Sequence, residues 1–281
     1  MKWGAGEGPA PLPSSMLDIE FAQATDCGRV RDHNEDYLGY VAPDAPAAAR
    51  SRGWLFVLAD GVGGHDRGED ASRLAVETLA DGFRRASDES SYLSLLPRLV
   101  QQANAKVYET GMASGPGGMP MATTIVTCAL RYDRAVVSHV GDSRCYLVRH
   151  GRAESLTRDH TVAGEHMRLG LITAREADSA STKHLLSRSV GNAMFVGVDT
   201  RDHSLIPGDV LLLCSDGLHG AVDASDMALI VTRNTSLEDA ARELIDLANE
   251  QDGGDNVSVQ LIRVRGVERV GMYRGRPYKL A

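Results

Sequence analysis

Strand-like apolar runs outnumber helical patterns in this chain, and this balance limits the folds that it can adopt. Six such runs are clear: WLFVLAD (54–60), TTIVTCALRY (123–132), AVVSHVGD (135–142), RCYLVRHG (144–151), DVLLLCSD (209–216) and NVSVQLIRV (256–264). The segment LDIEFAQATD (17–26) alternates apolar and polar residues, as a half-buried strand does. Short turns, one of them at Gly151, separate several of these runs, so neighbouring strands are expected to pair.

Helical periodicity marks two pairs of segments. Apolar residues recur three and four positions apart at Ala71, Leu74, Ala75, Leu79 and Phe83, and again at Leu93, Leu96, Val100, Ala103 and Val107. In the second of these helices, Pro97 is acceptable only in the first turn. Two more helices follow residue 216, the second of which opens at Ser236. Paired helices favour an α+β fold of antiparallel sheets with helices packed outside, and not a doubly wound parallel sheet.

The remaining segments carry loop patterns. We expect a loop between strands at 43–53, a flexible loop at 114–120, and a polar, irregular stretch from 157 to 184 with two short helix starts. One of these starts has the form of a capping box, with Thr173 followed three positions later by Glu176.

Composition is that of a globular protein. Of the 281 residues, 43% are hydrophobic, which is enough for one large core. We expect a disordered segment at 1–16, one domain at 17–265 and a tail at 266–281 with a disordered end. The net charge of −8 argues against a nucleic-acid or anionic-membrane partner, since such surfaces attract basic patches.

The cysteines and the N-terminus indicate a cytoplasmic location. None of Cys27, Cys128, Cys145 and Cys214 forms a CxxC pair, so they are expected to be buried free thiols of a reducing compartment. The N-terminal segment lacks the apolar core of a signal peptide. No run of about 18 apolar residues is present, so no membrane insertion is expected.

Three aspartates stand at the ends of expected strands. Asp60 and Asp216 each end an apolar run, and Asp255 directly precedes another. Strand ends of a packed sheet meet at a rim, where clustered carboxylates repel one another unless a cation lies between them. Their hard oxygen ligands suit Mg²⁺ or Mn²⁺. Asp-Gly is also a common turn dipeptide, so Gly61 and Gly217 leave the plain turn open as an alternative.

Five motifs along the chain occur in the same order as in a known protein family. They are RVRDHNED (29–36), LADGVGGH (58–65), VGDSR (140–144), CSDGL (214–218) and GGDNVSV (253–259). With them the chain resembles the bacterial branch of the protein phosphatase 2C (PPM) family from about Asp18 to Arg263. The resemblance implies a four-layer αββα sandwich, in which helix pairs flank two antiparallel sheets. It also implies a metal-dependent protein serine/threonine phosphatase in which a water that bridges two ions attacks phosphorus.

The resemblance assigns the metal ligands. Asp60 would bridge two Mn²⁺ or Mg²⁺ ions, with Asp216 and Asp255 completing one ion and the Gly61 carbonyl holding the other. Asp142 would bind a third, weaker ion, while a plain turn residue remains the alternative there. Glu35, Asp36 and Asn256 are expected to lie next to the metal ligands without binding the ions directly.

Arg31 matches the phosphate-binding arginine of the family, whereas Arg144 is expected to be structural. Val62 stands where eukaryotic members carry a histidine, so His65 is the candidate for proton transfer, with a loop-stabilising role as the alternative.

Two further departures from the family pattern concern substrate access. PMATT (120–124) lacks the glycine often found before the paired threonines, and KHLLSRSVG (183–191) follows the family pattern only loosely.

The implied partners are phosphorylated proteins, namely a bacterial-type Ser/Thr kinase or its targets, which would meet a flap around 160–182. One alternative is a pseudophosphatase that acts as a scaffold. Another is a two-metal phosphodiesterase, which needs histidine ligands, whereas His160, His166 and His203 are placed in polar loops.

Overall fold

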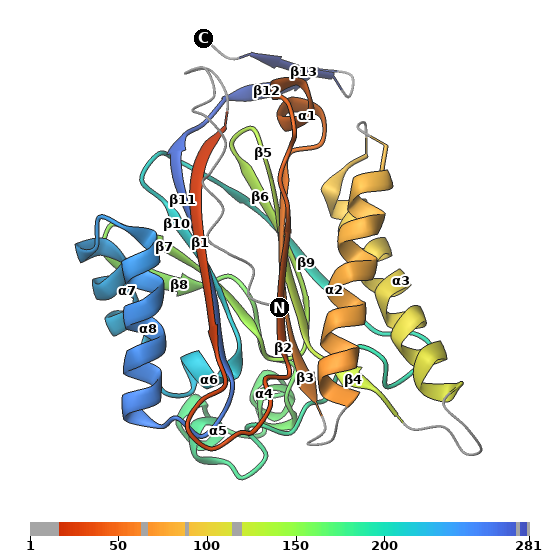
Figure 1. Ribbon diagram of the computed structural model, residues 1–281, viewed down its shortest axis with the longest axis vertical. Coiled ribbons are helices and arrows are strands. Elements are labelled where there is room, and N and C mark those ends of the chain that lie inside the picture. The colour runs from red at the N-terminus through yellow and green to blue at the C-terminus, as the bar shows by residue number, and fades with distance from the viewer. Residues whose placement is uncertain (1–16, 63–66, 88–89, 114–119, 274–275, 280–281) are drawn as a thin grey trace.

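The computed structural model shows two antiparallel sheets packed face to face, with a helix pair on the outer face of each (Figure 1). The structure describes residues 17–62, 67–87, 90–113, 120–273 and 276–279. The expected 1–16 segment, most of the 114–120 loop and His65 therefore lie outside the described residues. The αββα sandwich that the sequence predicts is confirmed, while the domain limits at 17 and 265 stay a prediction.

Each sheet is a continuous antiparallel ladder. The first sheet runs in the order β1 (Asp18–Asp26), β11 (Val257–Gly266), β10 (Val210–Cys214), β7 (Arg144–Arg149) and β8 (Arg152–Ser155). The second runs in the order β2 (Asp36–Val41), β3 (Trp54–Val62), β5 (Ile125–Arg131), β6 (Arg134–Val140) and β9 (Asp199–Ser204), and β4 (Ala122–Thr123) lies beside β3. The first and last strands of the domain, β1 and β11, are therefore direct neighbours.

The four long helices cover the two outer faces of the sandwich, and the short helices lie at its two ends (Figure 1). α2 (Arg67–Arg85) and α3 (Tyr92–Met112) cover the second sheet, and α7 (Ala224–Arg233) and α8 (Leu237–Gln251) cover the first. The short helices are α1 (Pro46–Ser51), α4 (Val162–Arg168), α5 (Ala174–Ser179) and α6 (Asp216–His219). Within the described ranges, no helix has both the length and the apolar character needed to cross a bilayer.

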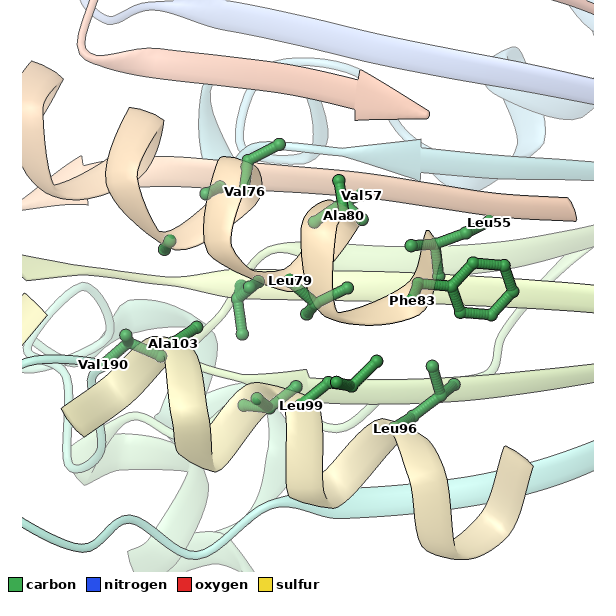
Figure 2. Close-up of a cluster of buried hydrophobic side chains, with 14 of the residues drawn as sticks. Leu55, Val57, Val76, Leu79, Ala80, Phe83, Leu96, Leu99, Ala103 and Val190 are labelled. Carbon is green, nitrogen blue, oxygen red and sulfur yellow. The ribbon is translucent and has the colours of Figure 1, made fainter. Parts of the chain in front are cut away.

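β3 shows why its sequence lacks alternation. Leu55 and Val57 face α2 and α3, in the core that Figure 2 displays, whereas Phe56 and Leu58 face the other sheet. All four side chains are completely buried. Each such side chain stabilises the fold by about 1.5–3 kcal/mol through the apolar surface that it removes from water. A strand covered on both faces therefore reads as one continuous apolar run.

Two elements differ from the sequence prediction. The segment 43–53 contains helix α1, which starts with Pro46 in its first turn and continues through three alanines, so the expectation of a loop there is wrong. β9 is a polar edge strand that no apolar pattern marks. It is held by its ladder with β6 and by side-chain bonds across that ladder, such as Ser138 Oγ to Thr200 Oγ1 at 2.7 Å.

The buried face of α3 agrees with the predicted one at Leu96, Val100, Ala103 and Val107, and differs only at its start. Leu93, predicted to be buried, is 50% exposed, and Leu95 and Leu99 are buried in addition. Pro97 lies inside the helix and beyond its first turn, contrary to the expectation. A proline there removes the hydrogen bond to the carbonyl of Leu93. Because Leu93 lies on the solvent side, water can satisfy that carbonyl.

The end of the chain also differs from the expected disordered tail. β12 (Val270–Tyr273) and β13 (Arg276–Lys279) pair as an antiparallel two-stranded sheet.

The expectations for most of the cysteines and for one helix start are confirmed. Cys128, Cys145 and Cys214 are buried free thiols, and the capping box joins Thr173 and Glu176 at the start of α5. Cys27 is also a free thiol but is only partly buried, contrary to the expectation.

Two leucines of α3 test the observed helix face. Leu96→Ala should lower the free energy of unfolding by about 2–5 kcal/mol, since it opens a cavity among fully buried side chains. Leu93→Ala, the same change three residues away, should cost less than about 1 kcal/mol. Urea unfolding followed by circular dichroism measures both, and equal losses would contradict the observed face.

Candidate metal centre

The predicted acidic residues gather at one end of the sandwich, the end at which α4, α5 and α6 lie (Figure 1). They come from both sheets. Asp60 is near the end of β3 and Asp36 starts β2, while Asp216 and Asp255 border β10 and β11. Asp142 lies in the turn between β6 and β7. The antiparallel order places these strand ends together, since the end of one strand is level with the start of its neighbour.

Asp60 is at the centre of the group. It pairs directly with Asp36 across the β2–β3 ladder, an arrangement that is unfavourable for two carboxylates. Burial raises the pKa of Asp60 well above its ordinary value, and the charges of Asp36, Asp216, Asp142 and Asp255 raise it further. Four other carboxylates therefore lie close enough to act on this one side chain.

Two consecutive threonines hold the Asp60 backbone. Thr124 Oγ1 accepts a hydrogen bond from the Asp60 N–H at 3.0 Å, and Thr123 Oγ1 donates to the Asp60 carbonyl at 2.7 Å. The Thr124 hydroxyl also bonds the Ser143 hydroxyl at 2.6 Å, next to Asp142 in the chain. These hydroxyl bonds continue the hydrogen bonding beyond the end of the ladder between β3 and β5, so they fix the position of the Asp60 carboxylate.

Asp216 and Asp36 are linked through Ser215. Ser215 is the N-cap of α6, and its hydroxyl donates to Asp36 Oδ2 at 2.7 Å. The same hydroxyl accepts from the N–H of Ser258 at 3.0 Å, so it ties β2 to the other sheet. Burial raises the pKa of Asp216, and the Asp255 charge raises it further, while a hydrogen bond with the Asp60 carboxyl lowers it. The Asp60 and Asp216 carboxyl groups therefore lie close enough for the protonation of one to affect the other.

Glycines let the backbone segments cross at this point. A Cβ at Gly61 would lie 2.4 Å from the Gly68 carbonyl, and a Cβ at Gly217 would lie 2.1 Å from the Asn256 carbonyl oxygen. Both contacts are with backbone atoms, which cannot move aside. The glycines that follow Asp60 and Asp216 are thus required by close approach of chain segments, and not only by turn geometry.

Glu35 and Asn256 shape the loop between β1 and β2. Asn256 Oδ1 accepts from the Glu35 N–H at 2.8 Å, and its Nδ2 donates to the carbonyls of Cys27 and His33 at 3.0 and 2.9 Å. The Glu35 carboxyl lies against Gly68 in the first turn of α2. Burial raises the pKa of Glu35 despite the opposing charge of Arg31. Asn256 therefore holds the loop that carries both Glu35 and Arg31.

Two arginines take different positions. Arg31 Nη2 forms an ion pair with Asp255 Oδ2 at 3.0 Å, and both side chains are partly exposed at the mouth of the group. Arg144 instead forms a two-pronged pair with Asp159, at 2.9 and 2.7 Å, and donates to the Tyr146 hydroxyl. The structural role expected of Arg144 agrees with these contacts.

The donor set fits a hard divalent cation. Five carboxylates converge, and Asp36 Oδ1 is buried without a hydrogen-bond partner among the described residues. Carboxylate oxygens are the ligands that Mg²⁺ and Mn²⁺ prefer. Such ions would remove the repulsion that raises the carboxyl pKa values. The residues that could hold them are Asp60, Asp216, Asp255 and Asp142.

Sequence reasoning missed several residues of this site. In the sequence, Thr123, Thr124 and Ser215 have the pattern of ordinary strand and turn residues, and nothing local marks their hydrogen bonds to Asp60 and Asp36. His184 was not assigned, yet its Nδ1 lies 4.0 Å from Asp216 Oδ2 at the mouth of the site.

Two of the three histidines expected in polar loops lie elsewhere, His166 in α4 and His203 in β9. His160 lies in a loop as expected, but it is only 2% exposed and packs against His139 of β6. Within the part of the chain that the structure describes, none of the contacts of these three side chains reaches the five carboxylates.

Asp142 gives a pH-dependent prediction. Burial, followed by the Asp216 charge, raises the pKa of Asp142 from 3.8 to about 7. The folded protein therefore binds a proton between these pH values that the unfolded chain does not bind. In protein treated with EDTA, stability should thus fall as the pH rises from about 4 to about 7, by at most about 4 kcal/mol from this group. Chemical unfolding at several pH values measures the slope.

The matched variants are Asp142→Asn and Asp223→Asn, the latter at an exposed helix start. Asp142→Asn should reduce the slope and stabilise the EDTA-treated protein at pH 7.5, whereas Asp223→Asn should change neither. A slope that is unchanged in Asp142→Asn would contradict the raised pKa of this residue.

Comparisons with known proteins agree with this geometry. The family model described as "Protein phosphatase 2C" matches residues 28–261. A putative protein phosphatase 2C-type protein of Streptococcus pyogenes serotype M6 is 32% identical over 246 residues, which are 87% of this chain and 97% of that protein.

Solved structures give the same result. The PPM Ser-Thr phosphatase MsPP from Mycobacterium smegmatis, in complex with cacodylate, is 35% identical with a TM-score of 0.73, over 87% of this chain and 98% of that one. The catalytic domain of the serine/threonine protein phosphatase PstP, in complex with 2 manganese ions, is 30% identical with a TM-score of 0.75, over 89% and 99%. With a match over most of its length in sequence and in fold, this chain belongs to the protein phosphatase 2C family.

Proposed function

We propose that the protein is a metal-dependent protein serine/threonine phosphatase, which hydrolyses phosphoserine and phosphothreonine on proteins. The observation that carries this proposal is the convergence of four carboxylates, from both sheets, on that of Asp60, in a chain of the protein phosphatase 2C family. Curated relatives named as serine/threonine phosphatases, such as one from Listeria innocua, support the substrate class.

The proposed cofactors are two Mn²⁺ or Mg²⁺ ions held by Asp60, Gly61, Asp216 and Asp255, with a third, weaker ion at Asp142. Manganese in the PstP structure and the all-oxygen donor set support this choice. When bound, two such cations lower the pKa of a water and offset charge on the phosphoryl oxygens. Glu35 and Asp36, held in place by Asn256 and Ser215, would orient water around them.

Arg31 is the proposed phosphate-binding residue. Its guanidinium is 44% exposed and already points to the mouth of the carboxylate group through its pair with Asp255. A planar guanidinium can donate two parallel hydrogen bonds to phosphate oxygens. A substrate phosphate that approaches Asp255 would meet this side chain first.

The leaving alkoxide needs a proton. We propose His65 as the donor, directly or through water, because Val62 offers no proton at the position that carries histidine in eukaryotic members. His65→Ala protein with undiminished kcat would remove it from this role.

The proposed setting is the cytoplasm, where the enzyme would oppose a bacterial-type Ser/Thr kinase by acting on the kinase or its targets. The segment 160–182 contains α4 and α5 beside the carboxylate group and is the proposed flap that meets the substrate protein. A scaffold without catalysis remains the alternative outcome of the following experiment.

The deciding experiment is phosphate release from a phosphothreonine peptide, with and without Mn²⁺. Wild-type protein should release phosphate only with Mn²⁺. Asp216→Asn should lower kcat at least about 100-fold, above the 10- to 100-fold loss typical of residues that stand behind a metal ligand. Asp223→Asn, the same change at an exposed position, should leave kcat unchanged. Metal binding by wild type without any phosphate release would favour the scaffold.

Arg31 is tested by its effect on substrate binding. Arg31→Ala should lower kcat/KM about 10- to 100-fold, mainly through KM, because it removes a charge-assisted hydrogen bond to phosphate. Mn²⁺ affinity should stay equal or become tighter, since a cation next to Asp255 is removed. Arg29→Ala, at a nearby exposed arginine, should leave both unchanged. A normal KM in Arg31→Ala would exclude phosphate binding by this residue.

A further inference from the structure

His160 lies at the root of the proposed flap and is bound to the turn that carries Asp142. Its backbone N–H donates to the Gly141 carbonyl at 3.0 Å, and its ring Nδ1 lies 3.2 Å from the Gly141 N–H. Its own carbonyl accepts from the N–H of Ser187 at 2.8 Å, on the chain that returns from the flap. One buried residue thus connects both chains of the flap root to the residue before Asp142.

The surroundings of the ring fix its orientation. The ring stacks on His139 of β6, with centroids 4.6 Å apart and an angle of 17° between the planes. His139 is held in turn by a hydrogen bond to the Arg158 carbonyl at 2.8 Å. On the other side of the ring, Nε2 lies 3.5 Å from Asp199 Oδ2.

This cluster resembles a metal site but already contains a cation. Ligand atoms of His139, His160 and Asp199 lie within 4.8 Å of one another. Arg188, however, reaches into the group, with Nη1 3.1 Å from Asp199 Oδ1 and 3.3 Å from His160 Nε2. Its Nη2 also pairs with Glu165 of α4 at 3.1 Å. The guanidinium supplies the positive charge, so the cluster joins the flap to the sheet without a metal ion.

The hydrogen bonds define the protonation of His160. An Nδ1 that accepts from the Gly141 N–H cannot carry a proton, so the neutral ring carries its proton on Nε2, toward Asp199. With Nε2 protonated, Arg188 Nη1 donates to Asp199 and not to the ring. Burial, then the neighbouring His139 and Arg188, lowers the pKa of His160 to about 4, so the ring is neutral at physiological pH.

Gly141 has little freedom to move by itself. Its φ of +103° suits glycine, and a Cβ there would lie 2.7 Å from the Thr124 side chain. Asp142 follows directly, and its carbonyl accepts from His219 Nε2 at 3.0 Å. The turn that positions the Asp142 carboxylate is thus held by contacts with three residues, namely Thr124, His219 and His160.

We propose that His160 is a positioning residue for the weakest of the three ion sites: its Nδ1 holds the Gly141–Asp142 turn against the flap root, so that Asp142 faces Asp216. This inference rests on the proposed role of Asp142. It makes the affinity of the Asp142 site depend on a side chain that touches neither ion nor substrate.

The test counts Mn²⁺ ions bound to the full chain, from the electron paramagnetic resonance signal of free Mn²⁺ during titration. Asp142→Asn should lose the weakest class of sites. His160→Phe keeps a stacking ring but lacks the acceptor, and should weaken that class about tenfold, the effect of one lost hydrogen bond. His160→Asn offers Oδ1 near the position of Nδ1 and should stay within about threefold of wild type.

Several outcomes overturn the inference. His160→Phe with wild-type affinities does so, and so does an equal loss in His160→Asn. If Asp142→Asn keeps every ion, the Asp142 assignment fails together with the inference. Phosphate release by wild type, measured separately, then still decides the proposed function. If wild type releases phosphate, and Asp142→Asn loses ions while His160→Phe does not, only the role of His160 is contradicted.

A second measurement covers the case in which His160→Phe does not fold. Long-range ¹H–¹⁵N spectra of the wild-type protein with Mg²⁺ should show a neutral His160 protonated on Nε2. They should also show a scalar coupling between Gly141 nitrogen and His160 Nδ1 across the hydrogen bond. A proton on Nδ1, or absence of the coupling, overturns the inference.

Discussion

Repulsion among buried carboxylates is the constraint on which the rest of this structure depends. Asp36, Asp60, Asp142, Asp216 and Asp255 are brought to one end of the sandwich by strands of both sheets. Burial and mutual repulsion raise the pKa of at least four of them. Such a group is unfavourable for folding by itself, since each charge loses water and faces like charges. The fold must hold these side chains together with energy from elsewhere, and the three apolar clusters provide it.

The hydrogen bonds around the acids resist their separation. Thr123 and Thr124 hold the Asp60 backbone, and Ser215 joins Asp36 to the other sheet. Each of these hydroxyls bonds a backbone or carboxyl group from a different segment of the chain. The result is a rigid set of oxygen donors, which reduces the reorganisation required when a cation or a phosphate group arrives.

The sequence predicts the architecture well because strands buried on both faces and paired helices leave strong patterns. It identifies Asp60, Asp216 and Asp255 from their place at strand ends, and the five motifs add Asp142, Glu35 and Arg31 by resemblance. It misses β9, whose residues are polar and whose pairing is set by its neighbour β6. It also misses His160 and the threonine pair, because their roles come from hydrogen bonds to distant backbone groups, which leave no local periodicity.

The pairing of β1 with β11 has a consequence for how the chain folds during synthesis. Asp18 pairs with Gly266, so the first strand finds its sheet partner only after nearly the whole domain has been made. At about 5–20 residues per second, translation separates the two strands by roughly 10 to 50 seconds. During that interval β1 has an unpaired edge, and the second sheet with α2 and α3 can form first. The edge of the first sheet, where β1 meets β11, is thus the last part of the sandwich to close.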